Sequence, residues 1–367
     1  MKKNRPSSGT RILIVRLSAI GDVLHATSVV HTLRRICPDC HITWLVSPPA
    51  DSLLQNNPDI DKLIVWDRRR FDRAFSQRQF GTAWRCLRKA RAMLRACTFD
   101  IALDIQGLFL SGLLTRFSGA PRRIGIHDRH EGNFLFMTEM APVSLSRHKI
   151  HRYLTALAPL GISAKDFRPG LILPVPKSRQ AWAEHFWQAH GIKTGNPVRP
   201  ILLVNTRTTW PDKNWPAENF GRALAPLPDS VQIIFTGAPD DIPYVKKAQQ
   251  ALGRPSLSIA AETSLAELAA LFSCADLLLT GDTGPLYIAE AVGLPTLSLW
   301  GPTHPGIYGP LTDGHHFIIS PHSCTACCKT KCRHKTNACI HAISVETVTE
   351  KLKQLLKSVK PLPQPLS

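Results

Sequence analysis

A glycine and an aspartate follow the first apolar run of the chain. The run Arg11–Leu17 has the length of a buried strand, and the loop Ser18–Asp22 opens a stretch with helical spacing. Loops at the carboxyl ends of parallel strands bind ligands, and Gly21 lets the backbone approach one. Asp22 stands where a carboxylate can take a proton from an attacking hydroxyl group. It could instead only cap the helix, and the spacing leaves both roles open.

A second loop of this kind runs from Asn205 to Trp215, after an apolar run and before a helix that Pro216 begins. Its hydroxyl groups and its lysine suit phosphate. We expect Thr209 and Lys213 to grip a diphosphate, with Lys213 neutralising charge as a leaving group departs. A solvated lysine without function is the alternative.

The third loop runs from Thr280 to Glu290 and again joins a strand to a helix. Two glycines, a hydroxyl group and the backbone N–H groups of a helix N-terminus together form a ready anion site. Gly281, Thr283 and Gly284 lie on either side of Asp282 and make a ligand loop the expected use. Asp282 could also cap the helix and do nothing more.

Alternating strands and helices position these three loops. Strands are expected over 11–17, 41–46, 62–66, 100–104, 123–126, 201–205, 231–235, 276–279 and 296–300. Helices are expected over 23–35, 80–95, 108–117, 180–190, 217–225, 243–252, 264–274, 285–292 and 344–357. Such alternation predicts an α/β fold with parallel sheets covered by helices on both faces. Ser264 and Glu267 form a capping-box pattern at the start of one helix.

The length and the prolines predict two domains. A chain of 367 residues exceeds the roughly 250 residues at which a single core stops growing, and five prolines mark the stretch from Arg168 to Pro200. We expect an N-terminal domain over 1–178, a C-terminal domain over 179–345, and a final helix and tail over 346–367.

The composition is that of a basic globular protein. It is 44% hydrophobic, and 45 Lys and Arg against 27 Asp and Glu give a formal net charge of +18. This charge favours phosphates, nucleic acid or an anionic membrane face as partners. Nucleic acid is disfavoured, because no zinc finger, RNA-binding strand signature or long basic block is present. No apolar run reaches the ~20 residues of a membrane span, and the basic N-terminus lacks a signal-peptide core, so we expect a cytoplasmic protein.

Five of the ten cysteines crowd into sixteen residues near the C-terminus: Cys324, Cys327, Cys328, Cys332 and Cys339. Four thiolates at such spacing can reach one tetrahedral centre, so a structural zinc site is a possibility. A reduced, partly buried loop or an adventitious disulfide is the alternative that we favour. Any metal there would be structural.

In this order, the three loops resemble those of the heptosyltransferase family, the ADP-heptose:lipopolysaccharide glycosyltransferases of glycosyltransferase family 9. The resemblance spans Ile12 to Leu355, and its most specific pieces are the Gly21–His25 run, the Thr209–Trp215 segment and Asp282–Pro285 leading to Leu299–Thr303. It implies a GT-B fold, in which two Rossmann-like domains face each other across the active-site cleft. The first domain then binds the acceptor and the second binds the nucleotide sugar.

The resemblance also implies an activity: inverting transfer from ADP-L-glycero-D-manno-heptose to the inner core of lipopolysaccharide, with no metal or other cofactor required. Asp22 matches the family's general base. Thr209, Lys213, Asp282, Thr283 and Gly284 match contacts to the donor's phosphates and sugar. Asp241 falls where the family often has a glutamate near the ribose, and Thr263 falls near the adenine pocket. Two departures concern the donor: Asp241 is one methylene shorter than glutamate, and Tyr287 replaces the usual histidine.

For the acceptor, the family uses basic residues of the first domain against core phosphates. Arg68, Arg69 and Arg70 lie in the corresponding stretch, and arginine suits phosphate. Three consecutive arginines are also ordinary on a solvated surface. The expected partners are the nucleotide-sugar donor, the lipopolysaccharide acceptor and, by peripheral contact, the cytoplasmic face of the inner membrane.

Two rival functions stay open. One is an enzyme of the same fold that uses another nucleotide sugar, which the departures at Tyr287 and Asp241 allow. The other is a non-catalytic protein that binds glycolipid through the basic face. Intact Asp22, Lys213 and Asp282 argue against the second.

Overall fold

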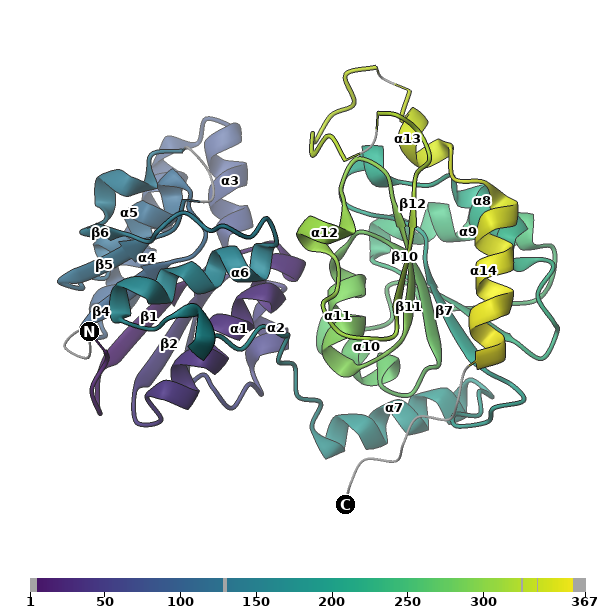
Figure 1. Cartoon of the computed structure of the whole chain (residues 1–367), viewed down its shortest axis with the longest axis horizontal. Helices are drawn as coiled ribbons and strands as arrows, with labels where there is room; N and C mark the ends of the chain where they lie inside the picture. Colours follow the sequence, from purple (N-terminus) through teal and green to yellow (C-terminus); the bar gives the residue numbers. More distant parts are fainter. Residues whose placement is uncertain (1–4, 128–130, 325, 335, 359–367) are drawn as a thin grey trace. The chain divides into compact units, whose positions relative to one another are not determined.

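The computed structural model describes residues 5–127, 131–324, 326–334 and 336–358. The chain divides into two compact units, Met1–Leu173 and Pro174–Ser367, and each contains its own six-stranded parallel sheet (Figure 1). The division lies in the proline-rich stretch, slightly before the boundary expected at residue 178.

Unit 1 contains the first sheet. Its strands are β1 (Arg11–Val15), β2 (His41–Val46), β3 (Lys62–Val65), β4 (Ile101–Asp104), β5 (Arg122–Gly125) and β6 (Glu139–Met140). Its helices are α1 (Ile20–Ile36), α2 (Asp51–Leu54), α3 (Arg68–Ser76), α4 (Phe80–Arg95), α5 (Phe109–Phe117) and α6 (Lys149–Leu154), with 3₁₀ segments η2 (Asn133–Phe136), η3 (Thr155–Leu160) and η4 (Ala164–Asp166). The strand order is β3-β2-β1-β4-β5-β6, and every pair is parallel.

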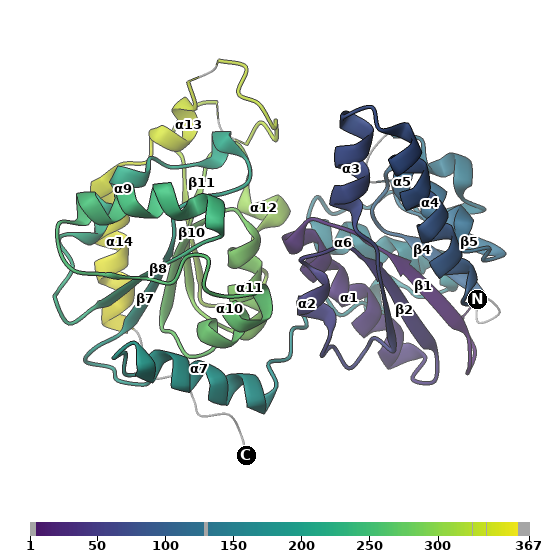
Figure 2. The ribbon, with the colours of Figure 1, turned by 180° about the vertical axis from the view of Figure 1, so that it is seen from behind.

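Helices cover both faces of this sheet, as the alternation in the sequence predicts. α1 and α6 lie on one face, and α3, α4 and α5 lie on the other (Figures 1 and 2). Side chains alternate along β1 because successive residues of a strand point to opposite faces. Ile12 and Ile14 therefore pack toward α1, whereas Leu13 and Val15 pack with Leu94 of α4.

Unit 2 repeats the design. Its strands are β7 (Ile201–Asn205), β8 (Gln232–Thr236), β9 (Leu257–Ser258), β10 (Leu277–Gly281), β11 (Thr296–Trp300) and β12 (His315–Ile319). Its helices are α7 (Lys177–Ala189), α8 (Ala217–Leu224), α9 (Ile242–Leu252), α10 (Leu265–Phe272), α11 (Gly284–Val292), α12 (Pro305–Tyr308), α13 (Ala338–His341) and α14 (Val345–Ser358), with 3₁₀ segments η5 (Pro211–Lys213) and η6 (Pro239–Asp241). The strand order is β12-β11-β10-β7-β8-β9, again all parallel. Written from its other edge, the order is β9-β8-β7-β10-β11-β12. The strands of unit 2, numbered within the unit, therefore follow the same 3-2-1-4-5-6 order as those of unit 1.

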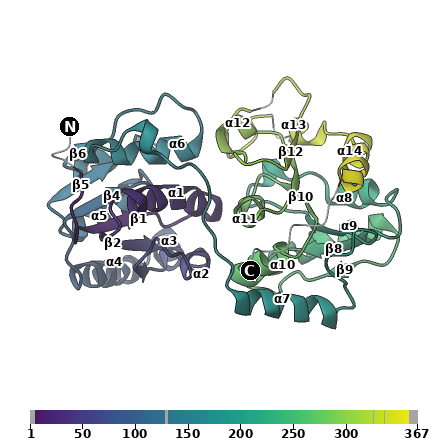
Figure 3. The ribbon, with the colours of Figure 1, turned by 60° about the horizontal axis from the view of Figure 1, so that its bottom comes forward.

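The second sheet also lies between two layers of helices (Figure 3). Apolar side chains of α8, α9 and α14 form one core with the strands. The final helix, which was expected as a separate segment, therefore contributes Val348, Leu352 and Leu355 to the core of unit 2. Thr349 adds a hydrogen bond from its hydroxyl group to the carbonyl oxygen of Ala223 in α8, at 3.0 Å.

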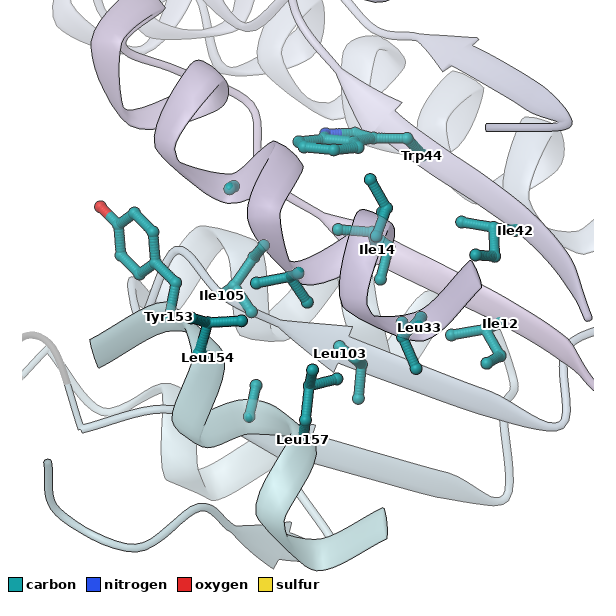
Figure 4. Packing of buried hydrophobic residues seen from close by; sticks show 14 of the residues in the cluster. Ile12, Ile14, Leu33, Ile42, Trp44, Leu103, Ile105, Tyr153, Leu154 and Leu157 are labelled. Carbon is teal, nitrogen blue, oxygen red and sulfur yellow. The ribbon is translucent and has the colours of Figure 1, made fainter. Parts of the chain in front are cut away.

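The core of unit 1 extends to a residue that matters below. Tyr153 of α6 is fully buried beside Leu154 and Leu157, while its hydroxyl group points out of the apolar cluster (Figure 4). Tyrosine is suited to such a position, because its ring is apolar and its hydroxyl group needs a partner.

Apolar periodicity predicted most of these elements. β2, β7, β11 and α4 have the expected bounds, and Ser264 and Glu267 form the expected capping box. The elements that were not predicted are β6, β9, β12, α2, α3, α6, α12 and α13. β6 and β9 are only two residues long, and α3 begins with three arginines, so these segments lack a clear apolar pattern. Within the described residues, no helix is long and apolar enough to cross a bilayer.

Cys37 and Cys40 form a disulfide between the end of α1 and the start of β2. The cysteine pattern did not predict this bond, because the two residues stand apart from the C-terminal cluster. The bond closes the short turn between the two elements.

Glu290 of α11 is a buried carboxylic acid that connects two parts of unit 2. It is 5% exposed, and the backbone N–H of Leu311 donates to its Oε1 at 2.8 Å. Burial penalises the charged form and raises the pKa of Glu290 from 4.5 to about 7, although backbone hydrogen bonds oppose this. The folded protein therefore holds a proton that the unfolded chain releases near pH 4.5.

We expect Glu290→Gln to change how stability depends on pH. As the pH rises from about 4.5 to about 7, the unfolded chain loses the proton that the folded state keeps, so wild-type stability falls by roughly 2–3 kcal/mol. The neutral amide removes this loss, so the variant gains that amount above pH 7. Urea unfolding between pH 4.5 and 8 measures it, with the exposed Glu350→Gln as control. If the free energy of unfolding depended on pH in the same way for wild type and Glu290→Gln, the raised pKa of Glu290 would be contradicted.

Candidate functional site

In each sheet the chain adds three strands toward one edge and then returns to the middle to add three strands toward the other edge. The strand order therefore reverses at one point in each sheet. This point lies between β1 and β4 in unit 1, and between β7 and β10 in unit 2. Loops that leave neighbouring strands there diverge, and ligands of open α/β sheets bind in the crevice between them. The loop after β1 lies at the first point, and the loops after β7 and β10 lie at the second. The three loops selected from the sequence thus occupy the ligand-binding positions of the two folds.

In unit 1, Asp22 is held by two other side chains. Nη2 of Arg16 lies 2.6 Å from its Oδ2, and the hydroxyl group of Tyr153 donates to its Oδ1 at 2.6 Å. The guanidinium group of Arg16 also lies over the ring of Tyr153, 4.9 Å from the centroid. The carboxylate, cation and phenol form one cluster, in which the carboxylate is 27% exposed.

The loops at the reversal point fix Arg16 in place. Its side chain is 5% exposed and donates to the carbonyl oxygen of Ile105 at 2.9 Å, just after β4. Its own carbonyl oxygen accepts from the indole N–H of Trp44, and the next residue, Leu17, donates its N–H to the side chain of Gln106. Because β1, β2 and β4 all contribute, the position of Arg16 follows from the sheet itself.

These charges set the ionisation of Asp22. Burial disfavours the carboxylate, but Arg16, then Lys149, the Tyr153 hydrogen bond and His25 outweigh it and hold the pKa of Asp22 well below its ordinary value. Asp22 is therefore ionised throughout the neutral range. It does not cap the helix, because the N-cap of α1 is Ala19 and the Asp22 side chain is engaged with Arg16 and Tyr153.

In unit 2, Lys213 and Asp282 form a buried ion pair. Nζ of Lys213 lies 2.5 Å from Oδ2 of Asp282, and the two side chains are 12% and 5% exposed. Asp282 also accepts from the hydroxyl groups of Tyr287 at 2.6 Å and Thr303 at 2.7 Å. Nζ of Lys213 lies 4.2 Å from the centroid of the Trp210 ring. Lys213 is thus not a solvated loop lysine.

The other residues of these two loops surround this pair. Asp282 does not cap α11, whose N-cap is Thr283 and whose first residue is Gly284. Thr283 and Gly284 are partly exposed at the start of that helix, where free N–H groups favour an anion. Thr209 is exposed, four residues before Lys213. The structure therefore groups an ammonium group and a helix N-terminus at the reversal point of unit 2.

Asp241 follows β8, and both oxygens of its carboxylate have partners within the protein. Its Oδ1 lies 2.9 Å from Nη1 of Arg207, and its Oδ2 accepts from the backbone N–H of Ala238 at 2.9 Å. Arg207 in turn lies over the ring of Tyr244, 4.9 Å from the centroid. Thr263 is half-buried in the turn between β9 and α10.

The three arginines expected to meet the acceptor open α3. Arg68 is partly buried: it pairs with Asp72 at 3.1 Å and donates to the hydroxyl group of Ser18 at 3.2 Å, in the same loop as Asp22. Arg69 and Arg70 are exposed. The start of α3 therefore lies beside the first loop.

Four cysteines of the C-terminal cluster lie around one pocket: Cys324, Cys327, Cys332 and Cys339. Burial and these neighbouring thiols raise the pKa of Cys339. Among the described residues, no group of three or more His, Cys, Asp or Glu side chains is arranged to hold a metal ion. The zinc hypothesis is therefore unsupported.

Comparison with known proteins decides the family. Residues 87–338 match glycosyltransferase family 9 (heptosyltransferase), a span that covers more than half of the chain and includes the loops after β7 and β10. The chain belongs to this glycosyltransferase family. The resemblance based on the three loops is confirmed, and with it the assignment as an enzyme.

Relatives of this glycosyltransferase align over most of its length. Lipopolysaccharide heptosyltransferase 1 of Pseudomonas aeruginosa is 26% identical over 335 residues, which cover 89% of this chain and 88% of the relative. Lipopolysaccharide core heptosyltransferase OpsX of Haemophilus influenzae is 26% identical over 299 residues, 80% of each chain.

Solved structures show the same fold. A family 9 glycosyltransferase from Veillonella parvula superposes with a TM-score of 0.76 at 24% identity, covering 95% of this chain and 98% of that one. ADP-heptose lipopolysaccharide heptosyltransferase II of Escherichia coli gives a TM-score of 0.74 at 20% identity, covering 95% and 99%. The predicted fold class, α/β of the GT-B type with two Rossmann-like units, is confirmed.

Sequence reasoning missed the partners of the candidate residues in this glycosyltransferase. Tyr153 lies 131 residues from Asp22 in the sequence, and no local motif marks it. Arg16 stands in the first loop itself, so a charge six residues before the carboxylate was an available signal. Arg207 likewise stands in the second loop, before Thr209.

We expect Tyr153→Phe to lower the turnover number of the glycosyltransferase about tenfold. The substitution removes a hydrogen bond to a charged carboxylate, which contributes roughly 1.5–3 kcal/mol, and frees one oxygen of Asp22 to rotate. Steady-state transfer rates measure the loss. ADP affinity, measured by calorimetry, serves as the control. It should not change, because the loops expected to bind phosphate, after β7 and β10, belong to unit 2, whereas Tyr153 belongs to unit 1. An unchanged turnover number would show that Tyr153 is not needed to position Asp22.

Proposed function

We propose that this glycosyltransferase moves heptose from ADP-L-glycero-D-manno-heptose to the inner core of lipopolysaccharide, with inversion and with Asp22 as general base. The observation that carries the proposal is the ionised Asp22 at the reversal point of the first sheet, held by Arg16 and Tyr153. The donor and acceptor classes are taken from the relatives, which are named lipopolysaccharide heptosyltransferases.

The proposed reaction is a single displacement. An acceptor hydroxyl oxygen attacks the anomeric carbon from the face opposite the leaving group, the bond from that carbon to the β-phosphate oxygen breaks, and the configuration inverts. The hydroxyl proton passes to Asp22 and the bonding electrons leave with ADP. A carboxylate with a depressed pKa is a weak base, so we place the proton transfer late, when bond formation has already acidified the hydroxyl group.

Lys213 and the start of α11 stabilise the departing diphosphate in this scheme. Lys213 already has a counterion, because Asp282 neutralises it in the unliganded protein. A donor diphosphate adds negative charge beside this pair, and the N–H groups at Thr283 and Gly284 supply further donors. Asp282 then keeps Lys213 in position, and Thr209 is placed to add a hydroxyl contact.

Tyr287 supports the same arrangement, although the family usually has histidine there. Its buried hydroxyl group donates to Oδ1 of Asp282, which leaves Oδ2 for Lys213 and Thr303. With tyrosine in place of histidine, both oxygens of the Asp282 carboxylate therefore have hydrogen-bond or ion-pair partners. For the nucleoside, we propose that Asp241 faces the ribose and that Thr263 borders the adenine pocket.

We propose that Arg68, Arg69 and Arg70 bind phosphates of the acceptor. Arg68 contacts Ser18 in the loop that carries Asp22, so an acceptor held there has its hydroxyl groups near the base. A core glycolipid is embedded in a membrane, and the net charge of +18 favours an anionic lipid surface. Peripheral contact with the cytoplasmic face of the inner membrane completes the proposal.

A donor screen tests the proposed substrate. Purified protein is incubated with candidate nucleotide sugars and a truncated lipopolysaccharide acceptor, and release of nucleoside diphosphate is measured. We expect ADP release only when ADP-heptose and acceptor are both present. Release with another nucleotide sugar would reassign the donor, and nucleotide binding without release from any donor would favour a non-catalytic glycolipid-binding protein.

Replacement of Asp22 tests the base. We expect Asp22→Asn to lower the turnover number by about 10²–10⁴, the usual contribution of general base catalysis, and to leave donor affinity unchanged. The amide keeps the shape of the side chain and an oxygen that can accept the Tyr153 hydrogen bond, but it removes the charge opposite the buried Arg16. The unfolding midpoint and the donor affinity of the variant are therefore measured beside its rate. Transfer at the wild-type rate would exclude Asp22 as the base.

A further inference from the structure

The helices α3 and α4 concentrate half of the protein's net charge. Between Arg68 and Arg95 the chain has nine arginines and Lys89 against one acid, Asp72, a net charge of +9 within a total of +18. All of these basic side chains except Arg68 are exposed. The two helices lie side by side on one face of unit 1 (Figure 2).

An aromatic ridge lies among these charges. Phe75, Phe80 and Trp84 are 59%, 61% and 61% exposed. The rings of Phe75 and Phe80 meet edge to face with centroids 6.0 Å apart, across the turn that joins α3 to α4. Trp84 follows Phe80 by four residues, one helical turn, so it lies on the same side of α4.

The core of unit 1 reaches only one end of this ridge, where Phe75 stacks on Phe71 with ring centroids 6.0 Å apart. Ala83, Ala90 and Leu94 form the buried side of α4 and pack against the sheet or its neighbours. A helix at a water-exposed surface ordinarily presents polar and charged residues on its outer side. Here the outer side instead combines large aromatic residues with arginines, which is the composition of helices that lie in a membrane interface.

We infer that the α3–α4 surface, defined by Phe75, Phe80 and Trp84 with the exposed basic residues of 73–95, docks the enzyme on an anionic lipid bilayer. The rings enter the boundary between headgroups and acyl chains, and the arginines meet lipid phosphates while their stems cover apolar surface. This inference rests on the membrane contact in the proposed function and assigns it to particular residues.

The geometry links docking to the acceptor. α3 begins with Arg68, beside Ser18 and the loop of Asp22, and ends at Ser76 next to the ridge. A single helix therefore runs from the proposed acceptor site to the proposed lipid surface. A glycolipid anchored in the bilayer then presents its phosphorylated core to the arginines that open α3.

Vesicle binding of the full chain tests the inference. The vesicles are phosphatidylglycerol with phosphatidylethanolamine, compared with phosphatidylcholine, and binding is measured by flotation. Phe80→Ser with Trp84→Ser removes two exposed rings, and Arg85→Gln with Arg88→Gln and Lys89→Gln removes three charges. The matched control is Phe134→Ser with Leu135→Ser, because these unit 1 residues are equally exposed, at 58% and 67%.

We expect wild type to bind the anionic vesicles and not phosphatidylcholine. The charge variant should bind about 100-fold more weakly, from ~1 kcal/mol for each basic residue, and the ring variant about tenfold more weakly. The control variant should bind like wild type. Transfer to a water-soluble, lipid-free acceptor fragment should be unchanged in all three variants, because none alters a proposed site residue.

The failures are separable. If wild type does not bind anionic vesicles, the membrane contact itself is wrong, whatever the donor screen shows. If wild type binds and the ring and charge variants bind equally well, the α3–α4 surface is not the docking site. Preferential binding of single-stranded RNA over the vesicles, lost in the charge variant, would assign the surface to nucleic acid.

Discussion

Parallel pairing with one reversal of strand order is the constraint on which both units depend. In each sheet the first strand of the unit lies beside the fourth, so the loops that leave them separate and expose the ends of their helices. Asp22 lies after one of these strands in unit 1, and Asp282 lies after one in unit 2. The two acids thus occupy comparable positions in two similar folds, although their surroundings differ.

The surroundings decide what each acid does. Asp22 pairs with a buried arginine that the sheet itself fixes, and it keeps partial access to solvent. Asp282 is almost fully buried and has three donors around it, namely Lys213, Tyr287 and Thr303. Removing one partner of such a pair ordinarily costs about 3–5 kcal/mol, because the remaining charge stays buried. Breaking either pair is therefore expected to destabilise its unit, because one charge would stay buried without its counterion.

Local sequence patterns were enough to predict the fold and the three loops, but not the contacts between side chains that are distant in the sequence. Apolar periodicity located β2, β7 and β11, since each is a buried parallel strand with a continuous apolar run. It missed α3, because this nine-residue helix has only three apolar residues, Phe71, Ala74 and Phe75, among five charged ones. Tyr153 could not be inferred as a partner of Asp22, because their contact depends on how α6 packs against α1. The cysteine spacing was compatible with zinc, yet spacing cannot show how the thiols point.

The place of α14 in unit 2 bears on how the protein is made. The core of unit 1 is complete within the first 173 residues, whereas that of unit 2 includes Val348, Leu352 and Leu355 of the last described helix. Domains generally fold as units, and N-terminal ones first, while synthesis continues. Unit 1 can therefore become native on the ribosome, but unit 2 keeps part of its apolar core exposed until α14 has emerged.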